Sequence, residues 1–482
     1  MVISIAAWCV ALGSLVSGAD DWNRFRGPDG RGVSDGTALP VDLSPERVAW
    51  KHSIPPGLSS PCLIGDRLFV TGHEGQRLST SCLDRETGAV LWKRSVVAEA
   101  LERHHEINSP ASPTPCSDGE RVVSYFGSFG LVAYDIEGDE LWRRPLPMPK
   151  NGFGTAASPV LAGGRLVFVN GAPADPFVEA MDPATGESIW KVEQNVGWST
   201  PAIWHRDGVD EVLVQGIWWL KAYDLRTGEE RWAVPGLTDE PITTPVTGDE
   251  LAFLTSYNMN DNPEVIGLPS FDEMLAQYDA DGDERLNREE AERNESILSR
   301  FDADGEGDHP LRLFFRFLDR DKSGDIARDE WQKIFDWLGQ YQHVNALLAV
   351  RPGKGDTGAE IAWQHGRGVP ECPSALCYRG SVYLIKNGGI LTCLAAANGE
   401  VRYRERLEAQ GPYYASPVAG DGKIYLASAR GEVTVLAAGE TLDIVSTSDL
   451  GERLMATPAL GRGEVFFRTE GHLIAFRVET ER

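Results

Sequence analysis

Basic side chains and apolar runs of membrane length are both scarce in this sequence. Its 482 residues include 46 lysines and arginines against 72 aspartates and glutamates, which gives a formal net charge of −26 at pH 7. That balance argues against a nucleic-acid partner, which needs a basic surface, and against direct contact with anionic lipid. Beyond residues 1–19, no apolar run reaches the roughly 20 residues of a spanning helix. We therefore expect no nucleic-acid partner and no transmembrane segment.

Cysteine is also scarce, with seven residues. No lipid-attachment motif surrounds Cys9, so a lipid anchor is not expected. Residues 1–19 are apolar and end in the small residues Ser17-Gly18-Ala19, which is typical of a cleaved signal peptide, although the usual basic start is missing. We interpret them as a signal peptide and expect a periplasmic or secreted protein. The spacing leaves open whether the other six cysteines form disulfides or are buried as small apolar residues.

The sequence is rich in one repeated unit: a small polar residue followed by proline, a turn and an apolar strand. Apart from one long gap, the prolines of its eight copies are 41 to 52 residues apart. Short strands repeated at that period are typical of four-stranded propeller blades, so the sequence predicts an all-β, eight-bladed β-propeller. The copies start at Ser60-Pro61, Ser112-Pro113, Ser158-Pro159, Thr200-Pro201, Thr244-Pro245, Cys372-Pro373, Ser416-Pro417 and Thr457-Pro458.

A second repeat lies between the copies of the first. In it a tight turn, built by Asp and Thr-Gly, precedes a tryptophan four positions after the glycine, as from Asp84 to Trp92, Asp182 to Trp190 and Asp224 to Trp232. The Asp and Thr side chains cap the turn and the glycine supplies a positive φ. We expect these tryptophans to wedge between neighbouring blades as core residues rather than to stack on a cofactor.

The two ends of the chain predict how the ring closes. The last copy, Thr457 to Val478, has enough chain for only three strands. The segment Val48-Ala49-Trp50, before the first copy, resembles a spare outer strand. Pairing these two parts would complete the eighth blade and leave no open strand edges.

Together the two repeats resemble those of the pyrroloquinoline-quinone-type (quinoprotein) propellers, and the resemblance covers most of the chain. The opening segment Trp22-Asn23-Arg24-Phe25-Arg26-Gly27-Pro28 is also similar to the lead-in of secreted bacterial members. The resemblance implies an eight-bladed fold. It leaves the function open, because the family includes calcium-dependent quinoprotein dehydrogenases and non-catalytic scaffolds such as the outer-membrane assembly lipoprotein.

The long gap predicts an inserted domain in blade five. Pro245 and Pro373 are 128 residues apart, and subtracting one ordinary blade of about 44 residues leaves about 84. We therefore assign residues 20–256 to the closing strand and blades one to five (first part), 257–343 to a small α-helical insert, and 344–482 to the rest of blade five and blades six to eight.

Two acidic twelve-residue loops in the insert predict an EF-hand pair that binds Ca²⁺. The loop from Asp319 to Glu330 has oxygen ligands at positions 1, 3 and 5, glycine at 6, an apolar residue at 8 and glutamate at 12. The loop from Asp279 to Glu290 differs by having Glu284 at the glycine position, where a left-handed backbone costs roughly 1–2 kcal/mol. We therefore expect the first loop to bind more weakly. The predicted ligands are Asp319, Asp321, Ser323, Asp325 and Glu330, and Asp279, Asp281, Asp283, Arg285 (through its carbonyl), Asn287 and Glu290.

Three alternatives for the insert stay open at this point. The loops could be acidic decoration without metal, the calcium could serve only to fold the insert, or it could switch the helices open. A third acidic stretch, residues 302–308, is not followed by the closing glutamate, so we interpret it as a linker.

Connections between blades share one face of a propeller with the connections between second and third strands. Residues 102–108 and the insert should therefore lie on the same face, together with Lys150, Asn151 and Trp198. Within that segment His104, His105, Glu106 and Asn108 offer imidazole, carboxylate and amide groups, which makes them weak candidates for a cofactor or metal site. We favour the alternative of a polar loop that hydrogen-bonds the rim.

The sequence favours a calcium-binding recognition or scaffolding module over an enzyme. Its partner would be an envelope protein or polysaccharide, and we expect a monomer. The main alternative is a quinoprotein oxidoreductase that acts on an alcohol or sugar with calcium and pyrroloquinoline quinone. Against it, no motif supplies the Glu, Asn and Asp set that the resemblance implies, and no two cysteines are adjacent as in several dehydrogenases. Arg, Asn and Asp in the central channel would favour the enzyme, whereas exposed rim aromatics would favour binding.

Overall fold

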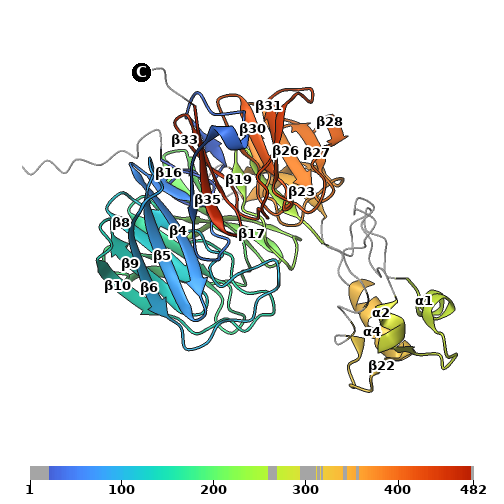
Figure 1. Ribbon diagram of the computed structural model, residues 1–482. Coiled ribbons are helices and arrows are strands. Elements are labelled where there is room, and N and C mark those ends of the chain that lie inside the picture. The colour runs from blue at the N-terminus through green and yellow to red at the C-terminus, as the bar shows by residue number, and fades with distance from the viewer. Residues whose placement is uncertain are drawn as a thin grey trace, which may run out of the picture.

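In the computed structural model the described strands form nine sheets: eight are the blades of a ring (Figure 1), and the ninth is a short two-stranded pair outside it. The structure describes residues 21–258, 269–293, 311, 315, 318–339, 345–353 and 358–478. The predicted all-β, eight-bladed propeller is therefore confirmed. The predicted signal peptide, Cys9 and the linker at 302–308 lie outside the described residues, as do parts of the predicted insert.

Each blade is an antiparallel sheet of strands that mostly follow one another along the chain. Blades one and two are β3 (Cys62–Ile64), β4 (Arg67–Glu74), β5 (Arg77–Asp84) and β6 (Val90–Val97), then β7 (Cys116–Ser117), β8 (Arg121–Phe126), β9 (Gly130–Asp135) and β10 (Glu140–Pro145). Blades three and four are β11 (Val160–Ala162), β12 (Arg165–Asn170), β13 (Phe177–Met181) and β14 (Ser188–Glu193), then β15 (Ala202–Arg206), β16 (Val209–Gly216), β17 (Trp219–Asp224) and β18 (Glu230–Pro235). Blades five and six are β19 (Val246–Thr247), β20 (Ala252–Ser256), β23 (Ala346–Pro352) and β24 (Ala359–His365), then β25 (Leu376–Tyr378), β26 (Ser381–Lys386), β27 (Ile390–Ala395) and β28 (Val401–Arg406). Blades seven and eight contain β29 (Val418–Gly420), β30 (Lys423–Ala427), β31 (Glu432–Ala437) and β32 (Ile444–Asp449), then β33 (Ala459–Gly461), β34 (Glu464–Arg468) and β35 (His472–Arg477).

The ring closes as the sequence predicts. Strand β2 (Val48–Ser53) pairs antiparallel with β35, with Trp50 opposite Ala475, and so supplies the outer strand of blade eight. Strand β1 (Val33–Ser34) adds in parallel to β29 of blade seven. Both ends of the chain thus share sheets with their distant partners, which leaves no gap between the first and last blades.

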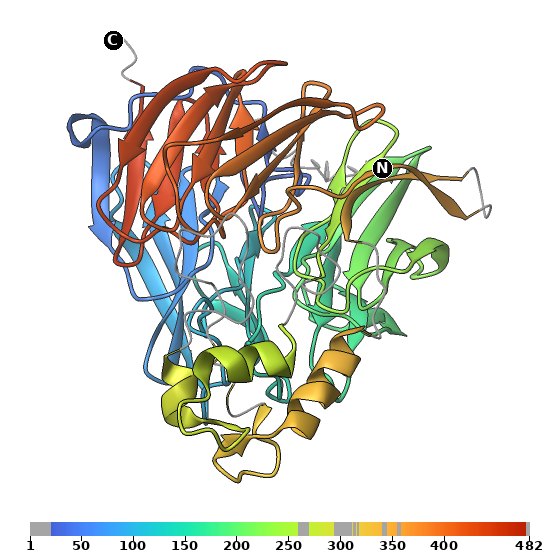
Figure 2. The same ribbon diagram turned by 90° about the vertical axis from the view of Figure 1, so that its right-hand side faces the viewer.

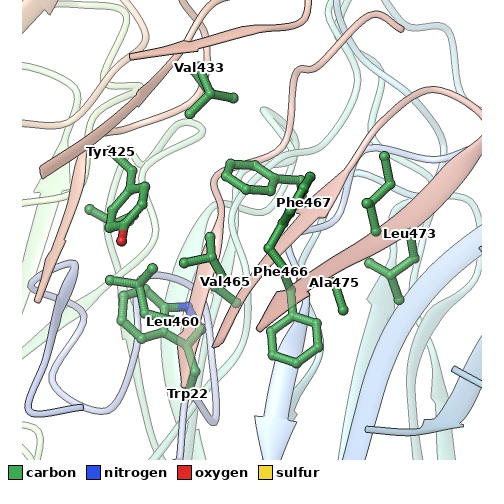
Figure 3. Packing of buried hydrophobic residues seen from close by; sticks show 14 of the residues in the cluster. Trp22, Tyr425, Val433, Leu460, Val465, Phe466, Phe467, Leu473 and Ala475 are labelled. Atoms are coloured by element: carbon green, nitrogen blue, oxygen red, sulfur yellow. The ribbon is translucent and has the colours of Figure 1, made fainter. Parts of the chain in front are cut away.

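Segment 21–34, which leads into the first blade, links several blades near the axis of the ring. Trp22 pairs with Leu63 of blade one and is fully buried in the same cluster as Leu460 and Val465 of blade eight (Figure 3). Arg24 donates to the carbonyl of Leu161 in blade three (3.1 Å). Arg26 donates to the carbonyl of Ala375 in blade six (2.7 Å), and complete burial lowers its pKa to about 9.

A belt of hydroxyl groups joins the inner ends of neighbouring blades. In each blade the innermost strand starts two residues after a buried Ser or Thr, and we call these eight residues the hydroxyl belt. Six contacts between belt residues have a backbone N–H of one blade donating to the hydroxyl of the next at 2.9–3.0 Å. The belt residues are Ser60, Thr114, Ser158, Thr200, Thr244, Ser374, Ser416 and Thr457.

The belt corrects two predicted blade starts. Blade two starts at Thr114 rather than Ser112, and blade six starts at Ser374 rather than Cys372. In blade two a second Ser/Thr-Pro pair lies just upstream of the true one, and in blade six the belt serine is followed by Ala375. The proline pattern therefore misassigns both starts by two residues, because the hydroxyl makes the contact between blades and the proline does not.

The repeated tryptophans lie between blades, as predicted. Each of five packs on the turn glycine of the next blade, where an added Cβ would come 2.5–2.8 Å from the indole ring. The indole N–H of each donates to a carbonyl of the same turn at 2.9–3.0 Å. These pairs are Trp50 with Gly88, Trp92 with Gly138, Trp142 with Gly186, Trp190 with Gly228 and Trp363 with Gly399.

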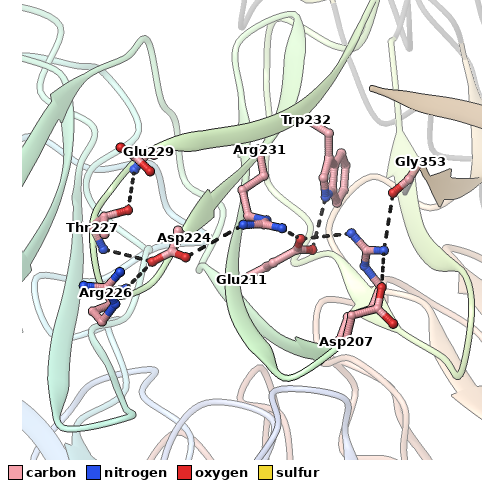
Figure 4. Close-up of polar contacts among 10 residues, drawn as sticks. Asp207, Glu211, Asp224, Arg226, Thr227, Glu229, Arg231, Trp232 and Gly353 are labelled. Carbon is pink, nitrogen blue, oxygen red and sulfur yellow. Dashed lines mark hydrogen bonds and ion pairs between the residues drawn. The ribbon is translucent and has the colours of Figure 1, made fainter. Parts of the chain in front are cut away.

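Blade four departs from this pattern. There Trp232 donates to the buried carboxylate of Glu211 (3.1 Å) in its own blade (Figure 4). Glu211 also accepts from Arg231 and Arg206 at 3.0 Å, and Arg206 reaches the carbonyl of Gly353 in blade five. Because a buried charge is stable only when it is paired, this cluster replaces the usual indole contact with an ionic one.

None of the six cysteines of the described chain forms a disulfide. Cys62, Cys82, Cys116 and Cys393 are buried, and burial raises the pKa of the Cys82 thiol to about 12. Of the two alternatives left by the sequence, the structure shows burial as small apolar residues for these four, while Cys372 and Cys377 are half-buried. None of the described helices is long and apolar enough to cross a membrane.

Candidate functional site

Between strands β20 and β23 of blade five the chain leaves the sheet and builds a separate helical unit. It contains α1 (Phe271–Tyr278), β21 (Leu286–Asn287), α2 (Arg288–Glu292), β22 (Asp325–Ile326) and α4 (Arg328–Gly339). Figures 1 and 2 show the helices grouped together at one side of the blades. This unit contains both acidic loops.

The two acidic loops pair with each other. Leu286 and Ile326, at position 8 of each loop, lie opposite one another in the short antiparallel pair β21 and β22. Both side chains are fully buried. The pairing of the two loops therefore buries the apolar residue that the sequence pattern has at position 8 of each loop.

Each loop brings three carboxylates together. One oxygen each of Asp279, Asp281 and Asp283 lies within 4.8 Å of the others. A backbone hydrogen bond from Asp283 lowers the pKa of Asp281, but burial and the charges of Asp283, Glu290 and Asp279 raise it more. A cation would relieve this repulsion.

The second loop gathers Asp319, Asp321 and Glu330 in the same way, within 4.8 Å. In this loop Asp319 Oδ1 is buried without a hydrogen-bond partner. Because a buried carboxylate oxygen without a partner is costly, its position suits a metal ligand.

The closing glutamates fold back over the start of their loops. Glu290 is 2 % exposed, and its two oxygens accept from the N–H groups of Ala280 (2.7 Å) and Asn287 (2.9 Å). Glu330 is 4 % exposed and accepts likewise from Arg320 (2.7 Å) and Ala327 (3.0 Å). Each carboxylate is thus held where a bidentate ligand would close a calcium cage.

The backbone is left-handed at positions 4 and 6 of both loops. In the first loop these are Gly282 (φ 75°) and Glu284 (φ 60°), and in the second they are Lys322 (φ 62°) and Gly324 (φ 95°). The strain expected at Glu284 is present, but Lys322 carries the same strain in the other loop. Backbone strain therefore gives no reason for the first loop to bind more weakly than the second.

We expect Glu284→Gly and Lys322→Gly to stabilise the calcium-loaded insert by similar amounts, each about 0.5–1 kcal/mol, because relief of the left-handed strain exceeds the entropy cost of glycine. Calorimetric unfolding of both variants with saturating calcium would measure the gains. If only Glu284→Gly gained stability, the first loop alone would be strained, as the sequence predicted.

The helices that flank the pair of loops contact each other through Trp331. This side chain is 1 % exposed, follows Glu330 directly, and lies 5.7 Å from Phe271 of α1. Its indole N–H donates to the carbonyl of Pro269 (3.0 Å). Asp272 of α1 and Arg328 of α4 add an exposed ion pair at 2.7 Å. Trp331 therefore reports on the second loop from within the interface of the two helices.

A second candidate site is a recess of about 230 Å³ at the hydroxyl belt. Connections between successive blades supply its wall in order around the ring: His105, Phe153, Trp198, Glu240, Glu371 and Tyr414. Phe25 of segment 21–34 also lines it. In each blade the innermost strand runs away from the hydroxyl belt and the second strand runs back toward it. The end of β20, the second strand of blade five, therefore lies on the same face as the recess, and the helical unit starts there.

Only two of the four predicted rim residues line the recess. His105 and Asn108 line the recess, whereas His104 and Glu106 are exposed and are not among its lining residues. Asn108 is a structural clamp, since its amide donates to the carbonyls of Phe153 (2.7 Å) and Thr155 (3.2 Å). The structure thus brings together two of the four.

Three rings form a cluster on one wall of the recess. His105 stacks on Phe153 at 5.8 Å, and Phe153 meets Trp198 edge to face at 5.6 Å. The Trp198 indole is fixed by its hydrogen bond to the Gly154 carbonyl (2.7 Å). Phe153 remains 49 % exposed, so the cluster presents an open aromatic surface.

Two glutamates follow the rings around the recess. Desolvation, with the nearby charges of Asp239 and Glu371, raises the pKa of Glu240 to about 7. The residue as a whole is exposed at the recess. Among the described residues that line the recess there is no Arg, Lys or Asp.

Comparison with known proteins agrees with this architecture. A family model described as outer membrane protein assembly factor BamB matches residues 33–197, 74–302 and 344–482. The chain belongs to that family. No curated protein sequence matches it.

Among solved structures, the chain is similar to BamB from Moraxella catarrhalis, with 11 % identity, a TM-score of 0.53 and coverage of 89 % of this chain and 99 % of that one. It is also similar to a europium-containing methanol dehydrogenase (12 %, 0.58, 95 % and 98 %). A third is the quinohemoprotein alcohol dehydrogenase from Comamonas testosteroni (13 %, 0.56, 96 % and 82 %). At such identities these likenesses establish the shared propeller fold alone.

Trp198 was predicted to lie on this face, whereas Phe153, Glu240, Glu371 and Tyr414 were not. These side chains lie two to five residues before the belt residue of the next blade. Once the belt residue of each blade is known, the residues two to five positions before it can therefore be predicted to line the recess.

Proposed function

We propose that this protein is a calcium-binding recognition module of the bacterial envelope, which uses the recess face of its propeller to bind a protein partner or serve as a scaffold. The observation that carries this proposal is the aromatic cluster of His105, Phe153 and Trp198, open at one end of the central channel. Trp218 and Trp219, at the turn between β16 and β17 on the same face, are 41 % and 40 % exposed. Exposed aromatic groups of this kind typically anchor protein partners.

We further propose that residues 257–343 form an EF-hand pair that binds Ca²⁺ through both loops, inserted between the propeller parts 20–256 and 344–482. Support comes from the paired position-8 residues Leu286 and Ile326 and from the two folded-back glutamates. The remaining proposed ligands follow the loop pattern: Asp279, Asp281, Asp283, Arg285 and Asn287 in one loop, and Asp319, Asp321, Ser323 and Asp325 in the other.

A periplasmic or secreted location is part of the proposal. The description of the matching family concerns outer membrane assembly, and the acidic composition suits a calcium-rich exterior. The solution state we propose is a monomer.

The competing function is that of a quinoprotein oxidoreductase. Two similar structures are dehydrogenases, one of them named a quinohemoprotein. The residues of the recess do not fit the quinone, however. Pyrroloquinoline quinone carries three carboxylates, whereas the described lining offers Glu240 and Glu371 and no Arg or Lys. Like charges of this kind in a concave site oppose binding.

We expect no binding when pyrroloquinoline quinone is titrated into the calcium-loaded protein by calorimetry at micromolar concentration, and no dye-linked alcohol oxidation. A known quinoprotein dehydrogenase titrated in parallel confirms that the quinone is active. Tight stoichiometric binding with turnover would replace the recognition proposal by an enzyme.

A further inference from the structure

Asparagine followed by glycine is prone to deamidation, because glycine has no Cβ to shield its backbone nitrogen. In this reaction the glycine nitrogen attacks the carbonyl carbon of the asparagine side chain. The sequence contains four such pairs, and all of them lie within the described residues: Asn151-Gly152, Asn170-Gly171, Asn387-Gly388 and Asn398-Gly399. The structure around each pair therefore decides where the reaction can occur in the folded protein.

Three of the pairs are held against this attack. The backbone N–H groups of Gly388 and Gly399 each donate to a carbonyl oxygen, at 2.8 and 2.9 Å, and Gly388 is also buried. Asn170 is 3 % exposed, and its amide, which would be the leaving group, donates to the Asp175 carbonyl (2.7 Å). Reaction at each of these pairs therefore has to break a hydrogen bond first.

The pair Asn151-Gly152 lies in the connection between blades two and three, where these restraints are missing. Asn151 is half-buried and Gly152 is exposed. Nothing lies within 4 Å of a Cβ added at Gly152, and no described group accepts a hydrogen bond from its N–H. The Gly152 nitrogen can therefore attack without breaking a contact, and water has access to the product.

Hydrogen-bond donors are already in place at the oxygen where negative charge develops. Asn151 Oδ1 accepts from the backbone N–H groups of Phe153 (3.0 Å) and Gly154 (2.6 Å). When the nitrogen adds to the carbonyl carbon, this oxygen becomes an oxyanion, which preorganised donors stabilise. Among the described contacts, the side-chain oxygens of Asn387 and Asn398 accept from one N–H group each.

We propose that Asn151-Gly152 is a site of spontaneous deamidation in the folded protein, and that the other three pairs are protected. The Gly152 nitrogen loses its proton to hydroxide and bonds to Cγ of Asn151. The bond from Cγ to the side-chain nitrogen then breaks, and that nitrogen takes a proton from water and leaves as ammonia. Water opens the remaining succinimide ring at either carbonyl, which gives aspartate or isoaspartate.

The modification would change the aromatic wall of the recess. Isoaspartate adds one methylene group to the backbone two residues before Phe153, and both products add a negative charge. Phe153 stacks on His105 at 5.8 Å, and its carbonyl accepts from the Asn108 amide (2.7 Å). Lengthening the backbone at this point would displace these contacts, so that older molecules would present a different recess surface.

The test is incubation of the full protein with calcium at mildly alkaline pH, followed by peptide mapping with mass spectrometry at successive times. We expect Asn151 to convert at least about threefold faster than each of the other three asparagines, because one hydrogen bond of ordinary net strength slows the attack by about that factor. The rate should rise with pH, since the attacking nitrogen must lose a proton. Equal or faster conversion at another pair, or no conversion at Asn151, would overturn the proposal.

Two controls separate the effect of the fold from that of the dipeptide. In denaturant the four pairs lose their contacts and should convert at similar rates. Gly152→Ala, at an exposed position with room for the Cβ, should lower the rate at Asn151 to that of the protected pairs. A preference for Asn151 that persists in denaturant would arise from the local sequence and would overturn the role given to the fold.

The reaction needs no partner, oxidant or cofactor. Its rate is therefore measured independently of the proposed recognition function, and a negative result would leave that function untouched.

Discussion

Replacing Glu330 by glutamine is expected to lower the calcium affinity of the loop from Asp319 to Glu330 about a hundredfold or more. The Glu330 carboxylate is buried and accepts hydrogen bonds from three backbone N–H groups. One of its oxygens lies within 4.8 Å of carboxylate oxygens of Asp319 and Asp321. Glutamine keeps the shape and one acceptor but removes the negative, bidentate ligand that closes the cage. Even the loss of residues that only support metal ligands typically costs 10–100-fold, so loss of a direct ligand should cost at least as much.

A matched control lies one residue away. Asp329→Asn removes the same charge at an exposed position whose carboxylate pairs with Lys333 at 2.8 Å. We expect it to change calcium affinity less than about threefold, since exposed charges are screened. Trp331 fluorescence and calorimetry would follow both variants. Equal losses in the two would show that general acidity, rather than an ordered cage, attracts the cation.

Replacing Gly228 by alanine is expected to destabilise the propeller by about 2–5 kcal/mol. The residue has φ 77°, and an added Cβ would come 2.6 Å from the indole of Trp190 in blade three. The left-handed backbone costs a non-glycine residue about 1–2 kcal/mol, and the forced displacement of a buried ring adds about 1–3 kcal/mol.

Replacing Gly208, in the same blade, by alanine would measure the cost of the left-handed backbone without the contact with an indole ring. It has φ 75°, but nothing lies within 4 Å of an added Cβ. Gly208→Ala should therefore cost only the backbone strain of about 1–2 kcal/mol. Thermal unfolding of both variants, monitored through tryptophan fluorescence and circular dichroism, would measure the difference. Equal melting temperatures of the two variants would show that the Trp190 ring moves away from the added Cβ without a loss of stability.

Several local features could be predicted from sequence because their causes are local. Asp, Thr and Gly at Asp182 to Gly186 build a tight turn, and the Trp190 that follows lies on an outer strand where it must be buried. The loop from Asp319 to Glu330 fixes its own chemistry, since ligand spacing and the left-handed position depend on neighbouring residues. The pairing of β2 with β35 was predictable by counting strands, because an eighth blade with three strands needs a fourth.

Other features depend on contacts between distant segments. The proline pattern gave the wrong start for blades two and six, because the belt hydroxyls of Thr114 and Ser374 are chosen by the neighbouring blade. Strain at Glu284 was foreseen, whereas the equal strain at Lys322 was not, since position 4 carries no sequence requirement in the loop pattern.

The sequence by itself determined the repeat, the number of blades and the composition of each acidic loop, because turn chemistry and strand periodicity act over a few residues. Only the tertiary structure decided which side chains meet at the recess. His105 and Tyr414 are separated by most of the propeller sequence, yet they line one cavity because the eight blades close into a ring. Ring closure brings the connections between successive blades together around one axis. No local sequence pattern shows which residues of these connections face one another there.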